Sequence, residues 1–111
     1  MSNRIKTLGR SIYGVLTNEA TGVISGNIVS GSTNNDFEFR RNTASGVIDN
    51  NTASGGDQNG FLFTNLNQGT FTNNNSINHL TGAGYLGIGT NGVNGTITGN
   101  TGSGNQSNNT P

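Results

Sequence analysis

The sequence predicts an all-β fold, a parallel β-solenoid in which about four coils of about 24 residues stack on one another. Two regularities support this fold: aromatic residues recur at a spacing of 24, and a glycine opens a second strand-like block in each repeat. The third observation is composition, because Asn, Gly, Thr and Ser make up 65 of the 111 residues. Gly and Asn at this density suit turns and would break helices, so a helical repeat is excluded.

The aromatic residues define the repeat and its first strand. Four of them lie 24 residues apart at every step, namely Tyr13, Phe37, Phe61 and Tyr85. Two positions later come Val15, Phe39 and Phe63, which gives the alternation of a strand with one buried face. Biased composition explains repeated Gly and Asn, but it does not place seven scarce aromatic residues in register. The coils are expected at about 13–36, 37–60, 61–84 and 85–108.

A second block follows in each repeat and begins with a turn glycine. The glycines are Gly22, Gly46, Gly69 and Gly95, at spacings of 24, 23 and 26. Two residues after each glycine comes an apolar residue, in the series Ile24, Ile48, Phe71 and Ile97. Five residues after each glycine comes an asparagine, in the series Asn27, Asn51, Asn74 and Asn100. Stacked repeats would align the apolar residues into interior ladders and the asparagines into a hydrogen-bonded ladder at a turn.

These G-x-[I/V]-x-x-N segments resemble the parallel β-helix repeat family. The F-x-x-N segments Phe39–Asn42 and Phe71–Asn74 are similar to repeats of autotransporter passengers and polymorphic outer-membrane proteins. The resemblance covers about residues 12–108. Together with the right-handedness that is usual for crossovers between parallel strands, it implies a right-handed parallel β-helix. It implies little about function, because such proteins include polysaccharide lyases, phage tailspikes, adhesins and inert stalks.

The two ends are expected to differ from the single solenoid domain at 13–108. Residues 1–12 lie outside the repeat and are expected to cap the first coil. The near-helical spacing of Ile5, Leu8 and Ile12 favours a short helix, although Gly9 weakens it and an extended strand is the alternative. A basic membrane-surface or targeting segment is a further alternative. Residues 109–111 are expected to be a tail, and the last coil lacks an apolar cap, so its sheet edges invite pairing with another copy.

Charge and composition exclude several classes of protein. The formal net charge is zero, which argues against a nucleic-acid partner because phosphate binding needs a basic face. The chain has no cysteine, and no apolar run approaches the ~18 residues of a membrane span. The basic N-terminus is not followed by a continuous apolar segment, so a secretory signal peptide is not expected.

The ionisable residues do not predict a catalytic, metal or cofactor site. A calcium-dependent polysaccharide lyase needs carboxylates aligned on adjacent coils, and no such column forms from Glu19, Asp36, Glu38, Asp49 and Asp57. Arg40 and Arg41 are expected to pair with Glu38 or Asp36 across the surface. His79 is the single histidine, which makes a poor zinc site, and it is expected to be a solvated loop residue.

Two further motifs resemble known binding sequences but lack the repetition on which those depend. The segment 55–60, Gly-Gly-Asp-Gln-Asn-Gly, resembles the glycine- and aspartate-rich calcium nonapeptide, which works by repetition, yet it occurs once. The pairs Thr70/Thr72 and Thr96/Thr98 resemble the flat threonine array of ice-binding solenoids. Asp49 interrupts this array, and threonine is common on any strand. Ice binding is therefore a remote alternative.

The favoured interpretation is a non-enzymatic structural or interaction protein. It would self-associate by head-to-tail stacking of coil ends into a surface or extracellular fibre or an adhesin stalk. The alternative is a carbohydrate-binding or polysaccharide-processing β-helix, which should present exposed aromatic residues. Six of the seven aromatic residues fall at inward positions of the repeat, which favours the structural interpretation. The expected partners are further copies of the chain, with a glycan possible. An extracellular or cell-surface location follows from the family resemblance.

Overall fold

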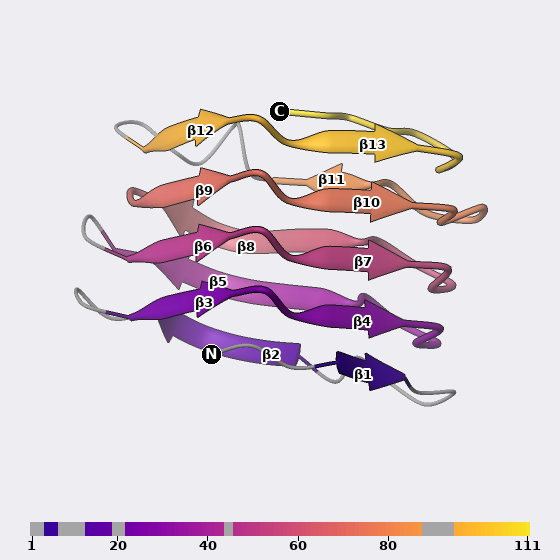
Figure 1. Ribbon diagram of the computed structural model, residues 1–111, viewed down its shortest axis with the longest axis horizontal. Coiled ribbons are helices and arrows are strands. Elements are labelled where there is room, and N and C mark those ends of the chain that lie inside the picture. Colours follow the sequence, from indigo (N-terminus) through magenta and orange to yellow (C-terminus); the bar gives the residue numbers. More distant parts are fainter. Residues whose placement is uncertain (1–3, 7–12, 19–21, 44–45, 88–94) are drawn as a thin grey trace.

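The protein is all-β in a computed structural model, which describes residues 4–6, 13–18, 22–43, 46–87 and 95–111. Within these ranges the chain forms short strands in three parallel sheets and contains no helix. Figure 1 shows the strands stacked in successive layers from the N-terminal to the C-terminal side. The fold is therefore built from parallel sheets of stacked strands, as the repeat predicts, and it is compatible with a β-solenoid.

The strands belong to sheets that we name A, B and C. Sheet A has the spatial order β1 (Arg4–Lys6), β4 (Ile28–Ser30), β7 (Thr52–Ser54), β10 (Asn75–Ile77) and β13 (Thr101–Ser103). Sheet B has the order β2 (Tyr13–Asn18), β5 (Phe37–Asn42), β8 (Phe61–Asn67) and β11 (Tyr85–Leu86). Sheet C has the order β3 (Val23–Ser25), β6 (Val47–Asp49), β9 (Thr70–Thr72) and β12 (Thr96–Thr98).

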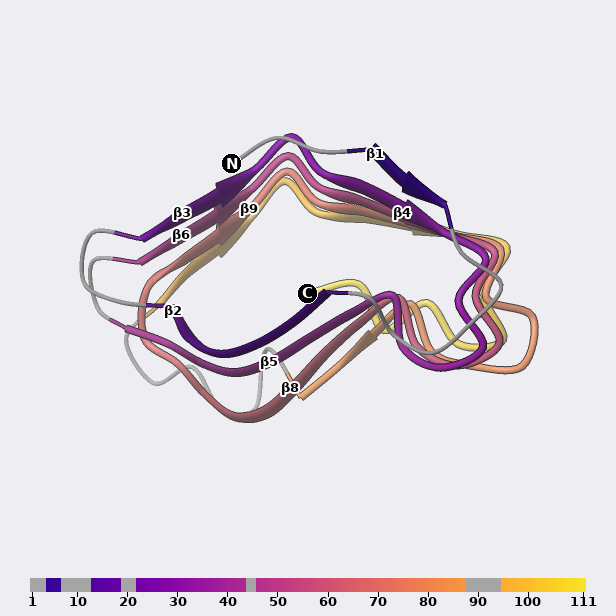
Figure 2. The same cartoon turned by 90° about the horizontal axis from the view of Figure 1, so that it is seen from below.

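Each strand pairs with the equivalent strand of the neighbouring repeat. From β2 onward the chain visits sheets B, C and A in turn, and Figure 2 shows the strands of each sheet superimposed around a common interior. Sheet B contains one irregularity, between Phe39 and Arg41, after which Asn42 pairs with Asn67 rather than with a residue 24 positions on. The extra residue in β8 is offset before the next block, where Val47 pairs with Thr70. The segment between β8 and Gly69 is two residues shorter than the segment between β5 and Gly46, which more than offsets the extra residue and gives the glycine spacing of 23.

Sheet A was not foreseen, because the sequence indicated only two strand-like blocks in each repeat. Its inward column, Val29, Ala53, Ser76 and Gly102, shrinks and becomes polar along the stack. An apolar pattern therefore does not mark these strands. What holds them is backbone pairing in the same register as the other two sheets.

The N-terminal segment is partly in the repeat rather than outside it, which corrects the sequence-based expectation. Residues 4–6 form strand β1, and Ile5 pairs with Val29 at a spacing of 24. For these three residues the extended alternative holds and the helix does not. Leu8, Gly9 and Ile12, on which the helical spacing depended, lie outside the described residues.

Two columns of turn residues use the left-handed region of backbone conformation. One column, between sheets C and A, contains Gly26, Asn50, Asn73 and Gly99, and the other, after sheet A, contains Gly31, Gly55, Asn78 and Gly104. Gly and Asn are the residues that adopt positive φ at least cost. The glycines that open the second block have a different function, as Gly69 shows: a Cβ there would lie 2.2 Å from Thr43 O and 2.3 Å from Gly46 O. Close approach of adjacent repeats, rather than turn conformation, requires this glycine.

The core is a column of apolar side chains contributed by all three sheets. It consists of Ile24, Val29, Phe37, Phe39, Ile48, Ala53, Phe61, Phe63, Phe71 and Tyr85, with Ile97 packed against it. Phe71 from sheet C meets Phe61 and Phe63 from sheet B edge to face, with ring centroids 5.6 and 5.7 Å apart. Such contacts add about 0.5–1.5 kcal/mol to the burial of each ring. The aromatic rings therefore tie sheet C to sheet B.

Replacing Phe61 by alanine is expected to lower the free energy of unfolding by about 3–5 kcal/mol, because the ring is fully buried between its neighbours. The matched control is Leu80→Ala, since Leu80 is 74% exposed. That change should stay within about 0.5 kcal/mol of the parent. Urea unfolding followed by circular dichroism measures both, and equal losses would contradict this assignment of the core.

Tyr85, which lies in sheet B, is hydrogen-bonded to the backbone where two strands of sheet A begin. Its hydroxyl donates to the backbone carbonyl of Asn74, at 2.7 Å, or of Thr101, at 2.6 Å. Burial raises the pKa of Tyr85 well above its ordinary value, and backbone hydrogen bonds offset this only in part. The hydroxyl therefore stays protonated in the folded protein under conditions in which an unfolded tyrosine ionises.

We expect Tyr85→Phe to flatten the alkaline part of the stability profile. A tyrosine whose folded pKa is raised contributes fully below its unfolded pKa of about 10, and this contribution is lost as the pH rises further. The parent should therefore lose stability more steeply than Tyr85→Phe above about pH 10. Urea unfolding at a series of pH values tests this, and parallel profiles would refute it.

Candidate functional site

The aromatic residues singled out in the sequence are adjacent in the structure. Phe61 stacks between Phe37 and Tyr85, with ring centroids 4.7 and 5.2 Å apart and planes inclined by 6° and 7°. Phe39 and Phe63 lie beside this column, with centroids 5.1 Å apart. In the backbone register of β2 and β5, Tyr13 pairs with Phe37 and Val15 pairs with Phe39. Ile24, Ile48, Phe71 and Ile97 occupy equivalent positions in sheet C.

The four asparagines that follow sheet C form a hydrogen-bonded ladder. Asn27 donates its backbone N–H and its side-chain Nδ2 to Asn51 Oδ1, at 3.1 and 2.9 Å. Asn51 donates in the same way to Asn74, and Asn74 donates to Asn100. Three of these asparagines also donate Nδ2 to a backbone carbonyl of sheet C. Asn51 donates to Ile24, Asn74 to Ile48 and Asn100 to Phe71. The amide-to-amide bonds of the ladder are therefore directional, because each asparagine donates to the Oδ1 atom of the next asparagine toward the C-terminal side.

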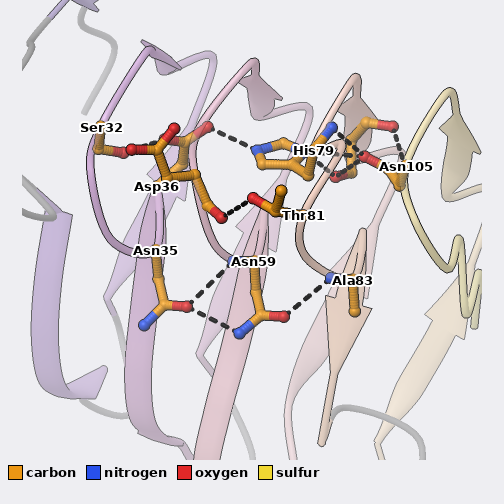
Figure 3. Close-up of polar contacts among 10 residues, drawn as sticks. Ser32, Asn35, Asp36, Asn59, His79, Thr81, Ala83 and Asn105 are labelled. Atoms are coloured by element: carbon orange, nitrogen blue, oxygen red, sulfur yellow. Dashed lines mark hydrogen bonds and ion pairs between the residues drawn. The ribbon is translucent and has the colours of Figure 1, made fainter.

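A buried acid and a buried imidazole meet at the corner between sheets A and B. Asp36 Oδ2 lies 2.9 Å from His79 Nε2, and both side chains are 0% exposed. The other carboxylate oxygen, Asp36 Oδ1, accepts a short hydrogen bond from Ser32 Oγ. Figure 3 shows the imidazole reaching from its own turn past the intervening repeat to the carboxylate. The contact therefore joins two repeats that are not neighbours.

Glycines in the intervening repeat make this reach possible. A Cβ at Gly56 would lie 2.7 Å from Asp36 Oδ1. A Cβ at Gly60 would lie 2.1 Å from Ser76 Oγ and 3.0 Å from the imidazole carbon Cε1 of His79. Side chains at either position would occupy the space that the carboxylate and the ring fill. The contact between Asp36 and His79 therefore requires glycine at both positions as well as the two polar side chains.

The far side of the imidazole is held by Asn105 and Ser76. His79 Nδ1 lies 2.8 Å from Asn105 Oδ1 and 3.1 Å from Ser76 Oγ. The same Asn105 Oδ1 accepts the backbone N–H of His79 at 2.9 Å, while Asn105 Nδ2 donates to Ser76 O at 3.0 Å. Both ring nitrogens of His79 thus have polar partners.

A second, shorter amide ladder runs beside this corner. Asn59 donates its backbone N–H and Nδ2 to Asn35 Oδ1, at 3.2 and 2.8 Å, and Ala83 N–H donates to Asn59 Oδ1 at 3.0 Å (Figure 3). Asn35 Nδ2 also donates to Glu38 Oε2 at 3.1 Å. This ladder donates in the opposite direction to the first and fixes the turn that leads into sheet B.

Two sequence-based expectations about these residues are wrong. His79 is not a solvated loop residue, because the glycine-lined corner buries it completely. Asp36 does not pair with an arginine on the surface, because it points inward to Ser32 and His79. Glu38 faces Asn35, and Arg40 is exposed.

The signal that was missed is positional. Ser32, Gly56, His79 and Asn105 each follow the positive-φ residue of their turn, so they form one column. Within that column two small residues precede a large polar one. Because Ser32 and Gly56 are small, this pattern could have indicated that the side chain of His79 extends along the stack into the space beside them.

The residue types at this corner are those of acyl-transfer enzymes, but the geometry does not admit a substrate. Ser76, His79 and Asp36 are joined by hydrogen bonds, as a nucleophile, a base and an orienting acid would be. All three side chains are 0% exposed, so no substrate carbonyl can reach Ser76 Oγ in this conformation. What the arrangement does is satisfy buried polar groups and link repeats.

Other kinds of site receive no support from the part of the chain that the structure describes. No group of three His, Cys, Asp or Glu side chains there could hold a metal ion. The same residues include no helix that is long and apolar enough to cross a membrane. Comparison with known proteins finds no match to a family model, to a curated protein or to a solved structure.

Asn51→Ala is expected to lower the free energy of unfolding by at least about 2 kcal/mol, because it removes two hydrogen-bonding groups from the ladder. Each buried partner left unsatisfied costs about 1–3 kcal/mol. Gln58→Ala removes an amide from an exposed side chain and should have almost no effect. Urea unfolding compares the two variants, and a negligible loss in Asn51→Ala would show that the ladder contributes little.

Proposed function

We propose that the chain is a right-handed parallel β-helix of about four coils that serves as a structural or interaction module, associating with further copies of itself through the ends of the stack. The observation that carries this proposal is the state of the outermost strands. β12 and β13 at one end of the stack, and β1, β2 and β3 at the other, each pair with one described strand only, whereas a parallel bridge from Ala83 to Ser107 lies beside the outer side of β11. Backbone groups on such edges readily pair with another chain.

The direction of the proposed association follows from the polarity of the stack. All three sheets are parallel, so a strand added to an edge in register runs the same way as its neighbour. The asparagine ladder also donates in one direction, from Asn27 toward Asn100. Head-to-head docking would place like groups against each other, whereas head-to-tail docking continues the pattern. A contact of this heterologous kind propagates into a filament.

The carbohydrate-binding alternative has less support. Glycan sites of a rigid solenoid would be expected to present aromatic faces to solvent. Among the described side chains the six aromatic residues are Phe37, Phe39, Phe61, Phe63, Phe71 and Tyr85, and all are buried. Ice binding is weakened by Asp49, which accepts hydrogen bonds from Thr72 and Asn73 within the threonine-bearing face. We place the protein at the cell surface or outside the cell, in keeping with a fibre or stalk.

Lysines on the proposed edge test the assembly against a control with matched chemistry. Thr96 and Thr101 lie on the outermost strands β12 and β13, while Thr70 and Asn75 lie at the paired positions one repeat further in. Thr96→Lys/Thr101→Lys should raise the concentration needed for association by on the order of tenfold, because edge lysines must stay solvated. Thr70→Lys/Asn75→Lys adds the same charge and should leave assembly nearly unchanged.

Electron microscopy and sedimentation of the purified chain at micromolar concentration provide the measurement. Thin uniform filaments with a ~4.8 Å diffraction repeat along their axis, weakened by the edge pair alone, would support the proposal. A β-rich particle that stays monomeric at every concentration would refute self-association. Equal effects of the two lysine pairs would refute the end-to-end geometry.

A further inference from the structure

The segment that follows β13 lies at the place where a further strand of sheet B would begin. Sheet A has five strands, whereas sheet B has four. Ser107 bridges Ala83 in parallel, and Gly84 N–H donates to Ser107 O at 2.7 Å. The equivalent bond one repeat earlier joins Gly60 N–H to Ala83 O at 3.0 Å. Ser107 therefore continues the backbone pattern of the stack beside the outer edge of sheet B.

The chain then leaves the path of a strand and turns inward. Asn109 has a φ of 45°, in the left-handed region, whereas an extended strand has a strongly negative φ. A Cβ at Gly102 would lie 2.8 Å from Thr110 Oγ1 and 3.3 Å from Asn108 Cβ. Gly102 lies in β13 and is paired with the buried Ser76 of β10. Thr110 and Asn108 therefore lie against the inner side of sheet A.

We call residues 105–111 the strap, because they cross the C-terminal end of the stack. Figure 1 shows the C-terminus in the outermost layer, and Figure 2 shows it inside the outline of the stack, between sheets A and B. Residues 106–110 are all exposed and include no large apolar side chain. A segment that buries so little apolar surface opens at a low cost in free energy. The strap is therefore a cover that can open while the rest of the fold stays intact.

Polar contacts fix the closed position of the strap. Asn105 is held by the backbone of the preceding repeat, where its Oδ1 accepts His79 N–H at 2.9 Å and its Nδ2 donates to Ser76 O at 3.0 Å. Asn105 Nδ2 also donates to Asn108 Oδ1 at 3.0 Å. Further along, Ser107 Oγ donates to Asn109 Oδ1 at 2.7 Å. The strap is thus anchored at Asn105, and the residues beyond Asn105 are held by fewer contacts.

We infer that the strap competes with a second copy of the chain for the outer edge of sheet B and so restrains end-to-end association. The inference rests on the proposed self-association, whose regulation it describes. A second copy that continued sheet B would place a strand beside β11, where Ser107 now bridges Ala83. The same strand would meet the residues that turn in over Gly102. The strap and the second copy therefore exclude each other at this edge.

The restraint is partial, and its size follows from the population of the open strap. β12 and β13 each pair with one described strand only, so the strap does not occupy every edge at this end. If only the open form associates, the concentration needed for association rises by the reciprocal of the open fraction. A strap that is open about one tenth of the time therefore raises that concentration about tenfold.

A pair of substitutions at Asn109 tests the strap without touching the core. Asn109→Val disfavours the left-handed conformation about tenfold, because a β-branched side chain clashes with the backbone there. It should lower the concentration needed for association by up to about tenfold. Asn109→Gly also removes the contact with Ser107 but permits a positive φ, so it should stay close to the parent. Sedimentation measures the three proteins, and equal values for the two variants would overturn the inference.

A reversible cross-link provides a second test within one variant. The chain has no cysteine, and a Cβ at position 102 would lie 2.8 Å from Thr110 Oγ1, so Gly102→Cys/Thr110→Cys places two thiols within reach of a disulfide. Oxidation of the dilute protein should lock the strap closed, which mass spectrometry verifies. The oxidised form should need a concentration at least about tenfold higher than the reduced form of the same protein. Equal association of the two forms, or failure of the cross-link to form within the chain, would overturn the inference.

The outcomes separate this inference from the proposed self-association. If the parent, both Asn109 variants and both redox forms associate at the same concentration, the strap does not restrain assembly and self-association stands. If the parent, Asn109→Val and the reduced form all stay monomeric at every concentration, self-association is refuted and the inference falls with it.

Discussion

Hydrogen bonding from one repeat to the next is the interaction on which the rest of this structure depends. Large apolar side chains are scarce here, because hydrophobic residues make up only 28% of the chain. The interior therefore includes amides and hydroxyls, and buried polar groups must be paired. In this fold they pair along the stack, as the side chains of Asn27, Asn51, Asn74 and Asn100 do.

That constraint explains which parts of the fold could be predicted from the sequence. Columns that serve the stack need the same chemistry in every repeat, so they leave a period in the sequence. Phe37 stacks on Phe61 because both fill the same position, and Asn51 bonds Asn74 for the same reason. The period therefore predicted strands, parallel pairing and the register of sheets B and C. It did not predict the extra residue in β8, which lies within a paired strand rather than at a turn.

The period could not predict features that differ from repeat to repeat. Sheet A was missed because its inward residues run from Val29 to Gly102, and backbone pairing needs no common side chain. His79 was misjudged because its partner Asp36 lies 43 residues away, which is not one repeat. A period of one repeat predicts contacts between adjacent repeats. The contact between Asp36 and His79 instead spans an intervening repeat and depends on the absence of side chains at Gly56 and Gly60.

These exceptions gather at one corner, and together they solve a problem that the regular columns create. If one part of the stack slipped by a whole repeat, phenylalanine would meet phenylalanine and asparagine would meet asparagine, so the ladders barely discriminate between registers. The corner does discriminate. A slip would move His79 away from Asp36 and would bring its ring against different residues at the positions of Gly56 and Gly60. Because an unpaired buried carboxylate is far more costly than a shifted ring stack, the irregular corner gives a repetitive chain one preferred register.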